Sequence, residues 1–184
     1  GLLGLVEDCF NLPSKLRLAI QLSLSALAVY LFIIPLTLPF SFFTFLFWII
    51  FITGTANFYN FMDGINGIAG LTGIVAFGLV VYFSFYIADD NNIIILSIAL
   101  MSACFGFLPF NFPKAKVFMG DVGSVFLGFV FGSFVVRLSN NISIFLCLIM
   151  FLCTFYADAI ITIYYRWKNG ENLMQAHRSH LYQY

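Results

Sequence analysis

Charged residues are scarce in this sequence. Only 9% of its 184 residues are Asp, Glu, Lys or Arg, and eight basic and eight acidic residues give a formal net charge of zero. Typical soluble domains carry about 25% charged residues. A chain without excess positive charge also lacks the broad field that attracts nucleic acid, so we expect no nucleic-acid partner.

Patterned cysteines are missing as well. The four cysteines form no CxxC pair and show no Cys/His spacing typical of a zinc site, and three of them lie inside apolar runs. Thiols in such runs pack as small hydrophobic side chains. The sequence therefore predicts no disulfide or metal site at Cys9, Cys104, Cys147 and Cys153.

Apolar residues are abundant instead, at 62% of the chain, with 25 phenylalanines. A helix that crosses a bilayer needs about 20 largely apolar residues, because unpaired backbone groups are costly in lipid. We predict an all-α fold: a polytopic transmembrane helix bundle of about six spans, forming one integral membrane domain over residues 1–184. The predicted spans are Leu16–Ile34, Leu36–Thr53, Gly67–Ala88, Ile93–Phe110, Val122–Val136 and Ile142–Tyr165.

The connections between these spans differ in polarity. Three are short and plain, whereas residues 1–15, 54–66, 111–121 and 166–184 hold most of the other polar residues. Six crossings place these four richer connections on one face of the membrane. That face carries most of the basic residues, so the positive-inside rule makes it cytoplasmic. Its basic residues are Lys15, Arg17, Lys114, Lys116, Arg166, Lys168 and Arg178, and only Arg137 lies on the other face.

The stretch NFYNFMDGINGIAG, residues 57–70, places polar side chains between two apolar spans. Asp63 is followed by three glycines at intervals of three, which permit tight turns and close approach of the backbone to a ligand. The alternative is that Asp63 only caps the following helix. A helix cap needs only one side-chain acceptor, whereas this stretch has four polar side chains. We therefore favour a binding role for the four residues together. This set is Asp63, Asn57, Asn60 and Asn66.

A second stretch, NFPKAKVFMGDVGS, residues 111–124, repeats this design with two lysines ahead of Asp121. Backbone amides at a helix start and nearby lysines suit an anion, and a carboxylate among them suits a divalent cation carried by that anion. Phosphate together with Mg²⁺ meets both requirements. The alternative is an N-cap at Asp121 with lysines that only set membrane orientation, and this segment alone does not decide between the two.

Two further clusters lie on the same predicted face. Glu7 and Asp8 are adjacent carboxylates that repel one another and so favour a bound cation, with a solvated loop as the alternative. His177 and His180 flank Arg178 without the additional ligands of a zinc site. Phosphate binding or proton transfer is therefore the favoured role of this pair, and a solvated tail is the alternative.

Asp158 differs from the other acidic residues because it lies inside the last apolar run. It is roughly 10 Å from the polar end of that run at about 1.5 Å per residue. An unpaired carboxylate is costly at such a depth. We expect Asp158 to face the protein interior, with a partner on another span.

At these motifs the sequence resembles the polyprenyl-phosphate N-acetylhexosamine-1-phosphate transferases. This membrane family, glycosyltransferase family 4, includes the phospho-N-acetylmuramoyl-pentapeptide transferase of peptidoglycan synthesis. The matching stretches are GLVEDCFNLPSKLRLAIQ, NFYNFMDGINGIAG, NFPKAKVFMGDVGSVFLG and AHRSHLYQ, in the family's order. The last stretch looks closest to members that start O-antigen or similar polysaccharide chains.

The resemblance implies transfer of a sugar 1-phosphate from a UDP-sugar to undecaprenyl phosphate, with release of UMP. It implies Mg²⁺ as the cofactor, with Mn²⁺ as an alternative ion, and a site on the cytoplasmic face of the bacterial inner membrane. It leaves a homodimer open as an assembly. Several spans precede the paired-acid motif in family members, so we expect the family's N-terminal spans to be missing from this chain.

Roles for individual residues also follow from the resemblance. Asp8 resembles an aspartate proposed to deprotonate the lipid phosphate, Asp121 the magnesium ligand, and Asp63 a further essential acid that we place at the metal and in catalysis. Glu7 stands where the family usually has Asp, and Asn66 where many members have a second Asp. The other implied contacts are Phe118 on uracil, Asn57, Asn60, Asn66 and Asn111 around the nucleotide, and Lys114, Arg178, His177 and His180 near the phosphates.

Two other functions fit part of the pattern. A transporter for phosphorylated solutes would use the glycines at broken helices, but the charges gather at one face and no inverted repeat is visible. An intramembrane aspartyl protease would use Tyr156-Ala157-Asp158 and Met119-Gly120-Asp121. The order of those two motifs is reversed, and this function gives residues 57–70 no task.

Overall fold

The secondary structure of the protein is entirely helical in the residues that its computed structural model describes, which are 1–10, 12–33 and 42–171, with turns and loops between the helices. No strand occurs in these ranges, which confirms the predicted all-α class. The α-helices are α1 (Leu2–Phe10), α2 (Ser14–Ile33), α3 (Phe42–Phe61), α4 (Ile68–Phe83), α5 (Asn91–Asn111), α6 (Gly120–Leu138), α7 (Ile142–Ile149) and α8 (Cys153–Lys168). A π-helical turn, η1 (Ser84–Ala88), extends α4, and a 3₁₀ turn, η2 (Met150–Leu152), joins α7 to α8.

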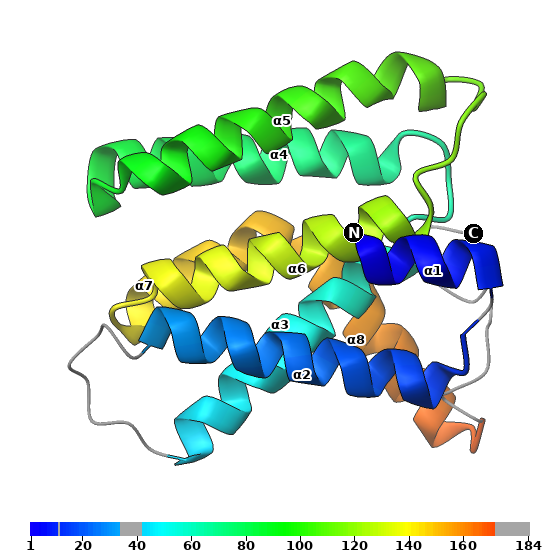
Figure 1. Ribbon diagram of the computed structural model, residues 1–184, viewed down its shortest axis with the longest axis horizontal. Coiled ribbons are helices and arrows are strands. Elements are labelled where there is room, and N and C mark those ends of the chain that lie inside the picture. The colour runs from blue at the N-terminus through cyan, green and yellow to red at the C-terminus, as the bar shows by residue number, and fades with distance from the viewer. Residues whose placement is uncertain (11, 34–41, 172–184) are drawn as a thin grey trace.

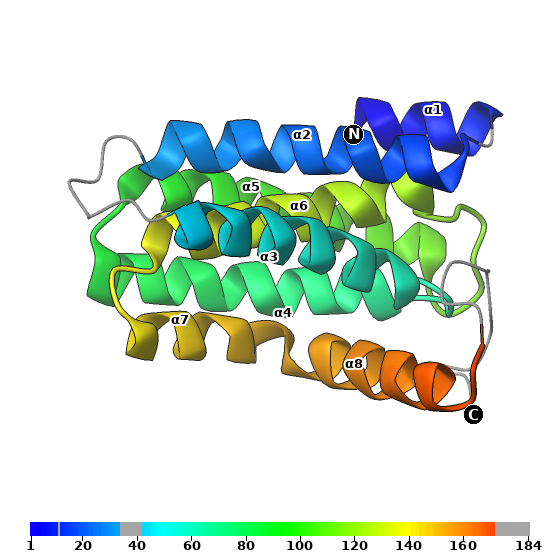
Figure 2. The same ribbon diagram turned by 90° about the horizontal axis from the view of Figure 1, so that it is seen from below.

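The long helices run side by side, so their connections gather at two ends of the bundle (Figures 1 and 2). One end holds the end of α1, the start of α2, the α3–α4 and α5–α6 connections and the end of α8, on the right in Figure 2. We call this the polar end. The α4–α5 and α6–α7 connections lie at the opposite end. The connections predicted to share one face therefore do so wherever the structure describes them.

Five described stretches are long and apolar enough to cross a membrane, which supports the predicted polytopic bundle. They are Phe42–Phe61, Ile68–Ala88, Asn91–Asn111, Gly120–Leu138 and Ile142–Lys168. Helix α2 has 20 residues but is not among them, and Lys15, Arg17 and Gln21 lower the hydropathy of its first half. Large apolar side chains such as Ile95 and Phe105 are exposed on the outer faces, as lipid contact requires.

The bounds of one predicted span are wrong. The second was placed at Leu36–Thr53, but α3 runs from Phe42 to Phe61, so Asn57 and Asn60 lie in its last turns instead of a loop. Both amides are satisfied there by hydrogen bonds to other segments, which offsets the cost of polar groups in an apolar helix. The last predicted span, Ile142–Tyr165, is confirmed as the candidate span Ile142–Lys168, which contains the 3₁₀ turn η2.

Helix α6 lies at the centre of the bundle and is the most buried of the candidate spans. It packs directly on α3 because Gly128 has no side chain. A Cβ atom at Gly128 would lie 2.8 Å from the Ala56 Cα and from the Thr55 carbonyl oxygen. Small residues let membrane helices approach this closely. The crossing fixes the start of α6 relative to the end of α3, and both of these segments lie at the polar end.

The structure confirms the prediction that Asp158 is buried inside the protein. The side chain is 6% exposed, and Thr162 Oγ1, one turn further along α8, donates a hydrogen bond of 3.0 Å to Asp158 Oδ1. This contact comes from the same helix, and the expected partner on another span stays a prediction.

Candidate active site

The first turn of α6 is held by a carboxylate from α1. The backbone N–H groups of Asp121 and Val122 donate hydrogen bonds of 3.1 Å each to Asp8 Oδ1 and Oδ2. Helix starts leave such amides without partners inside the helix. Gly4 brings α1 close enough, because a Cβ there would collide with the backbone of Asp121 and Val122. The paired-acid motif and Asp121, distant in sequence, are therefore in direct contact.

Arg17 of α2 joins two of the acidic residues. Its Nη1 lies 3.1 Å from Glu7 Oε1 and 3.2 Å from Asp121 Oδ2. All three side chains are partly shielded, with 16–24% of their side-chain surface exposed. The guanidinium offsets part of the repulsion between the two carboxylates. It also places a basic group 3.2 Å from the Asp121 carboxylate, where an anion can approach.

Helix α3 supplies the polar partner on the other side of Asp121. Asn60 Nδ2 donates a hydrogen bond of 3.1 Å to Asp121 Oδ1, and Asn60 Oδ1 accepts one of 3.1 Å from Ser124 Oγ. Ser124 also donates to the Gly120 carbonyl oxygen at 2.8 Å. The Asp121 carboxylate is thus oriented by Arg17 and Asn60 together, with a separate contact to each of its oxygens.

Asp63 lies in the turn between α3 and α4, close enough to Asp121 for their charges to interact. Burial, followed by the negative charge of Asp121, raises the pKa of the Asp63 carboxyl from 3.8 to about 7. No hydrogen bond or ion pair reaches its side chain from any residue that the structure describes. A carboxylate with a raised pKa beside a second carboxylate is a common arrangement in functional sites.

Neither capping alternative holds. The N-cap of α4 is Gly67, in the left-handed region with φ of 86° and no side-chain cap bond, so Asp63 does not cap this helix. The N-cap of α6 is Met119, also without a side-chain cap bond, and Asp121 lies inside the first turn. The cap of α6 comes from Asp8 in another helix, which local sequence cannot indicate.

The arrangement of acids fits Mg²⁺ better than a metal held by protein alone. Within the ranges described, no three His, Cys, Asp or Glu side chains come together to enclose an ion. Mg²⁺ is usually bound by one or two carboxylates, with water and substrate phosphates completing its shell. Asp63 and Asp121 provide two carboxylates, and the buried Glu7 Oε2 beside them has no hydrogen-bond partner among the described residues. The donor set therefore fits Mg²⁺ carried by a phosphate ligand.

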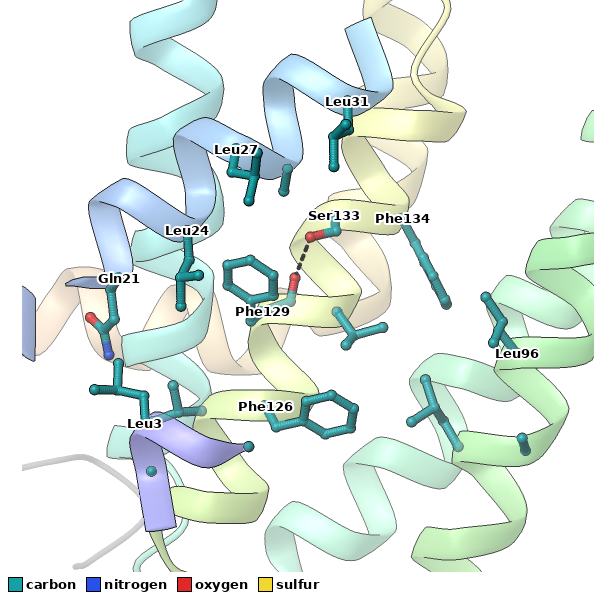
Figure 3. Close-up of a pocket in the computed structure, with 17 residues that line it drawn as sticks. Leu3, Gln21, Leu24, Leu27, Leu31, Leu96, Phe126, Phe129, Ser133 and Phe134 are labelled. Atoms are coloured by element: carbon teal, nitrogen blue, oxygen red, sulfur yellow. Dashed lines mark hydrogen bonds between the residues drawn. The ribbon is translucent and has the colours of Figure 1, made fainter. Parts of the chain in front are cut away.

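Asn57 connects the site to an apolar groove. Its Nδ2 donates to Gln21 Oε1 and to the Thr53 carbonyl oxygen, at 2.8 Å each. Gln21 is 2% exposed and lines a groove of about 610 Å³ between α2, α5 and α6 (Figure 3). Leucines and phenylalanines make up most of the wall. Gln21 thus joins the polar side chain of Asn57 to the wall of an apolar groove.

Of the other predicted contact residues near the polar end, two make hydrogen bonds within the protein and two are exposed. Asn111 is 4% exposed and joins two loops, accepting from the Gly67 N–H at 2.6 Å and donating to the Val117 carbonyl oxygen at 2.9 Å. Asn66 donates to the Pro113 carbonyl oxygen at 3.1 Å. Lys114 and Phe118 are exposed on the loop between α5 and α6. These contacts set the shape of the loops that border Asp63 and Asp121.

Several expectations fall outside this picture. His177, Arg178 and His180 lie outside the described residues. Conversely, we had not expected Arg17, Ser124 or Gln21 at the site. Arg17 and Gln21 interrupt an apolar helix near its start, which is the available sequence signal for them, whereas Ser124 had no distinguishing signal.

The fold and the site define a polytopic helical membrane protein whose acidic residues converge at one end of the bundle. The chain belongs to glycosyl transferase family 4, because the model of that family matches residues 1–139.

Among curated relatives, the chain is similar to a phospho-N-acetylmuramoyl-pentapeptide-transferase of Staphylococcus epidermidis. They share 33% identity over 109 residues, which is 59% of this chain and 34% of the relative. It is also similar to the transferase of that name from Streptococcus pyogenes serotype M49, at 27% identity over 150 residues, 70% of this chain and 43% of the relative. The chain thus spans less than half the length of these relatives.

Proposed function

We propose that the protein transfers a sugar 1-phosphate from a UDP-sugar to undecaprenyl phosphate and releases UMP. The observation that carries this proposal is the convergence of Asp8, Arg17, Asn60 and Asp121 at one end of the bundle, with the charge of Asp63 close by. Family membership and relatives named as phospho-sugar transferases support the same reaction class.

The chemistry joins two anionic reactants at a membrane surface. A phosphate monoester has a second pKa of about 6, so the lipid phosphate is already largely deprotonated near neutral pH. What the reaction needs is neutralisation of charge and alignment of the two phosphates. The Arg17 guanidinium can bind a phosphate oxygen when it leaves Asp121 or Glu7, because its fork of donors matches that geometry.

Mg²⁺, held by Asp63 and Asp121, would supply the additional positive charge on the phosphates of the nucleotide. The chain's own residues orient these ligands: Asn60 and Arg17 fix the Asp121 carboxylate, and the α3–α4 turn presents Asp63. Asn57 and the exposed Phe118 and Lys114 are proposed to contact the nucleotide. His177, Arg178 and His180 are proposed to act at the phosphates.

The biological setting is part of the proposal. The basic residues of the polar end favour a cytoplasmic site in a bacterial inner membrane. The AHRSHLYQ ending supports a role in starting a cell-surface polysaccharide such as O-antigen. The apolar groove next to Gln21 is consistent with a lipid-linked reactant.

The direct test is UMP release in membranes that contain the intact protein. Undecaprenyl phosphate, Mg²⁺ and a panel of UDP-sugars are supplied, and we expect UMP only when the lipid phosphate and one accepted sugar nucleotide are both present. Transport of the sugar nucleotide into vesicles without UMP formation would contradict the proposal and support the transporter.

The raised pKa of Asp63 predicts a pH-dependent affinity for the metal. Below pH 7 an ion must displace the proton from this carboxyl, so the affinity for Mn²⁺ used as a probe should rise about tenfold per pH unit up to pH 7 and then level off. Mn²⁺ binding followed by electron paramagnetic resonance measures this. Asp63→Asn should bind Mn²⁺ more weakly and without that slope. A wild-type affinity constant from pH 5.5 to 8 would contradict the assignment.

The same pKa has a consequence for stability without metal. The folded protein keeps a proton on Asp63 between pH 3.8 and about 7, where the unfolded chain has released it. This group therefore lowers the free energy of unfolding as the pH rises through that window, and its contribution is level above pH 7. Asp63→Asn should remove this part of the pH dependence in thermal unfolding.

A further inference from the structure

Asp8 is in a position that differs from that of a catalytic base. Both carboxylate oxygens accept hydrogen bonds from the backbone of another helix, at 3.1 Å from the Asp121 nitrogen and 3.1 Å from the Val122 nitrogen. These contacts join residues more than 100 positions apart and end at the residue proposed to hold Mg²⁺.

Two glycines make this contact geometrically possible. Gly4, one turn before Asp8 on α1, lets the two helices touch where a Cβ would collide with the backbone of Asp121. Gly120 has φ of 62°, in the left-handed region, and a Cβ there would lie 2.7 Å from Asp8 Oδ2. Any larger residue at either position would push the carboxylate away from the start of α6.

The contact also determines where the side chain of Asp121 points. Asp8 fixes the Asp121 nitrogen, while Arg17 and Asn60 each contact one oxygen of the Asp121 carboxylate. Releasing the nitrogen would loosen the first turn of α6 and alter these two contacts. The position of the proposed metal ligand thus depends on Asp8, although no described contact joins the two carboxylates.

We infer that Asp8 is a positioning residue, which caps α6 from α1 and thereby holds Asp121 in the geometry that binds a divalent cation. This inference rests on the proposed function for its catalytic consequence only. The lipid phosphate needs no strong base near neutral pH, so the reaction does not require Asp8 to take up a proton.

The test uses Asp8→Asn in the intact protein, because an amide can accept one of the two backbone hydrogen bonds but places an NH₂ group against the other donor. We expect amide hydrogen exchange at residues 121 and 122 to accelerate by about tenfold without any ligand. We also expect the Kd for Mn²⁺ to rise by about tenfold and UMP release to fall.

Asp90→Ala is the control, because Ala removes the capping oxygen that Asn would keep. Asp90 caps α5 through one oxygen, Oδ1, which accepts from the backbone N–H groups of Asn92 and Ile93 at 3.2 Å each, and it belongs to the α4–α5 connection at the opposite end of the bundle. This variant should accelerate exchange at residues 92 and 93 and leave Mn²⁺ binding and UMP release unchanged. If Asp8 only stabilised the start of a helix, the two variants would change the Kd for Mn²⁺ by the same factor.

Other outcomes decide against the inference. If Asp8→Asn leaves exchange and Mn²⁺ binding unchanged but removes turnover, Asp8 acts on a substrate proton. If Asp8→Asn fails to fold, Gly120→Ala perturbs the same contact while keeping the carboxylate, and unaltered Mn²⁺ binding in that variant overturns the inference. Should the wild-type protein release no UMP, the proposed function fails, whereas the exchange and Mn²⁺ measurements still test the role of Asp8.

Discussion

Asp121→Asn is expected to reduce UMP release by about 10²- to 10³-fold and to weaken divalent-cation binding strongly. The substitution keeps the shape of the side chain but removes the negative charge that faces Arg17 and that would bind the ion. Asn60 keeps a partner, because the Asn oxygen can still accept its hydrogen bond of 3.1 Å. Initial rates of UMP release at saturating Mg²⁺, with Mn²⁺ affinity measured in parallel, give the size of both effects.

Asp89→Asn is the control for this prediction. Asp89 is an exposed acid at the opposite end of the bundle, in the left-handed region with φ of 53°, which Asn adopts easily. It should express, fold and turn over like the wild type. A comparable loss of UMP release in the two variants would show that the reaction does not take place at the polar end.

Gly128→Val is expected to have the largest effect on the fold and to reduce activity with it. The valine side chain would meet the backbone of α3 at Thr55 and Ala56, which cannot move aside as a flexible side chain can. Overpacking of this kind costs about 3 kcal/mol. Pushing α3 away from α6 would also separate Asn60 from Ser124 and Asp121. Thermal unfolding in detergent and UMP release should both fall.

Gly106→Val provides the matched comparison for the helix crossing. Gly106 lies in α5, and a Cβ there would have no atom within 4 Å, so the same substitution meets open space. Stability and UMP release should stay close to wild type. If Gly128→Val retained both, the close α3–α6 crossing would not be what aligns the site.

The sequence was sufficient for the fold class and for the gathering of polar segments at one end. Both follow from simple physics: apolar runs of sufficient length must cross the membrane as helices, and successive crossings alternate sides. The structure confirms that the end of α1, the start of α2 and the α3–α4 and α5–α6 connections share an end. Asp121 and Asn60, assigned to one site from separate motifs, are joined by a hydrogen bond.

The parts that the sequence could not predict depend on contacts between distant segments. Asn57 and Asn60 read as loop residues because isolated amides are unfavourable in an apolar helix, and only Gln21 and Asp121 explain their place in α3. A capping carboxylate that comes from α1 leaves no local signal at α6. In the sequence, Arg17 reads only as a basic residue that sets the membrane orientation. Its ion pairs with Glu7 and Asp121 are visible only in the structure.

The two proposed metal ligands differ in their freedom to move. Asp121 starts the most embedded helix and has both oxygens engaged, whereas Asp63 lies in a turn and no described residue bonds to its carboxylate. Asp121 is therefore held in one orientation by its neighbours, whereas no described contact fixes the Asp63 carboxylate. Of the two proposed ligands, Asp63 is the one that can reorient without breaking a hydrogen bond of the fold.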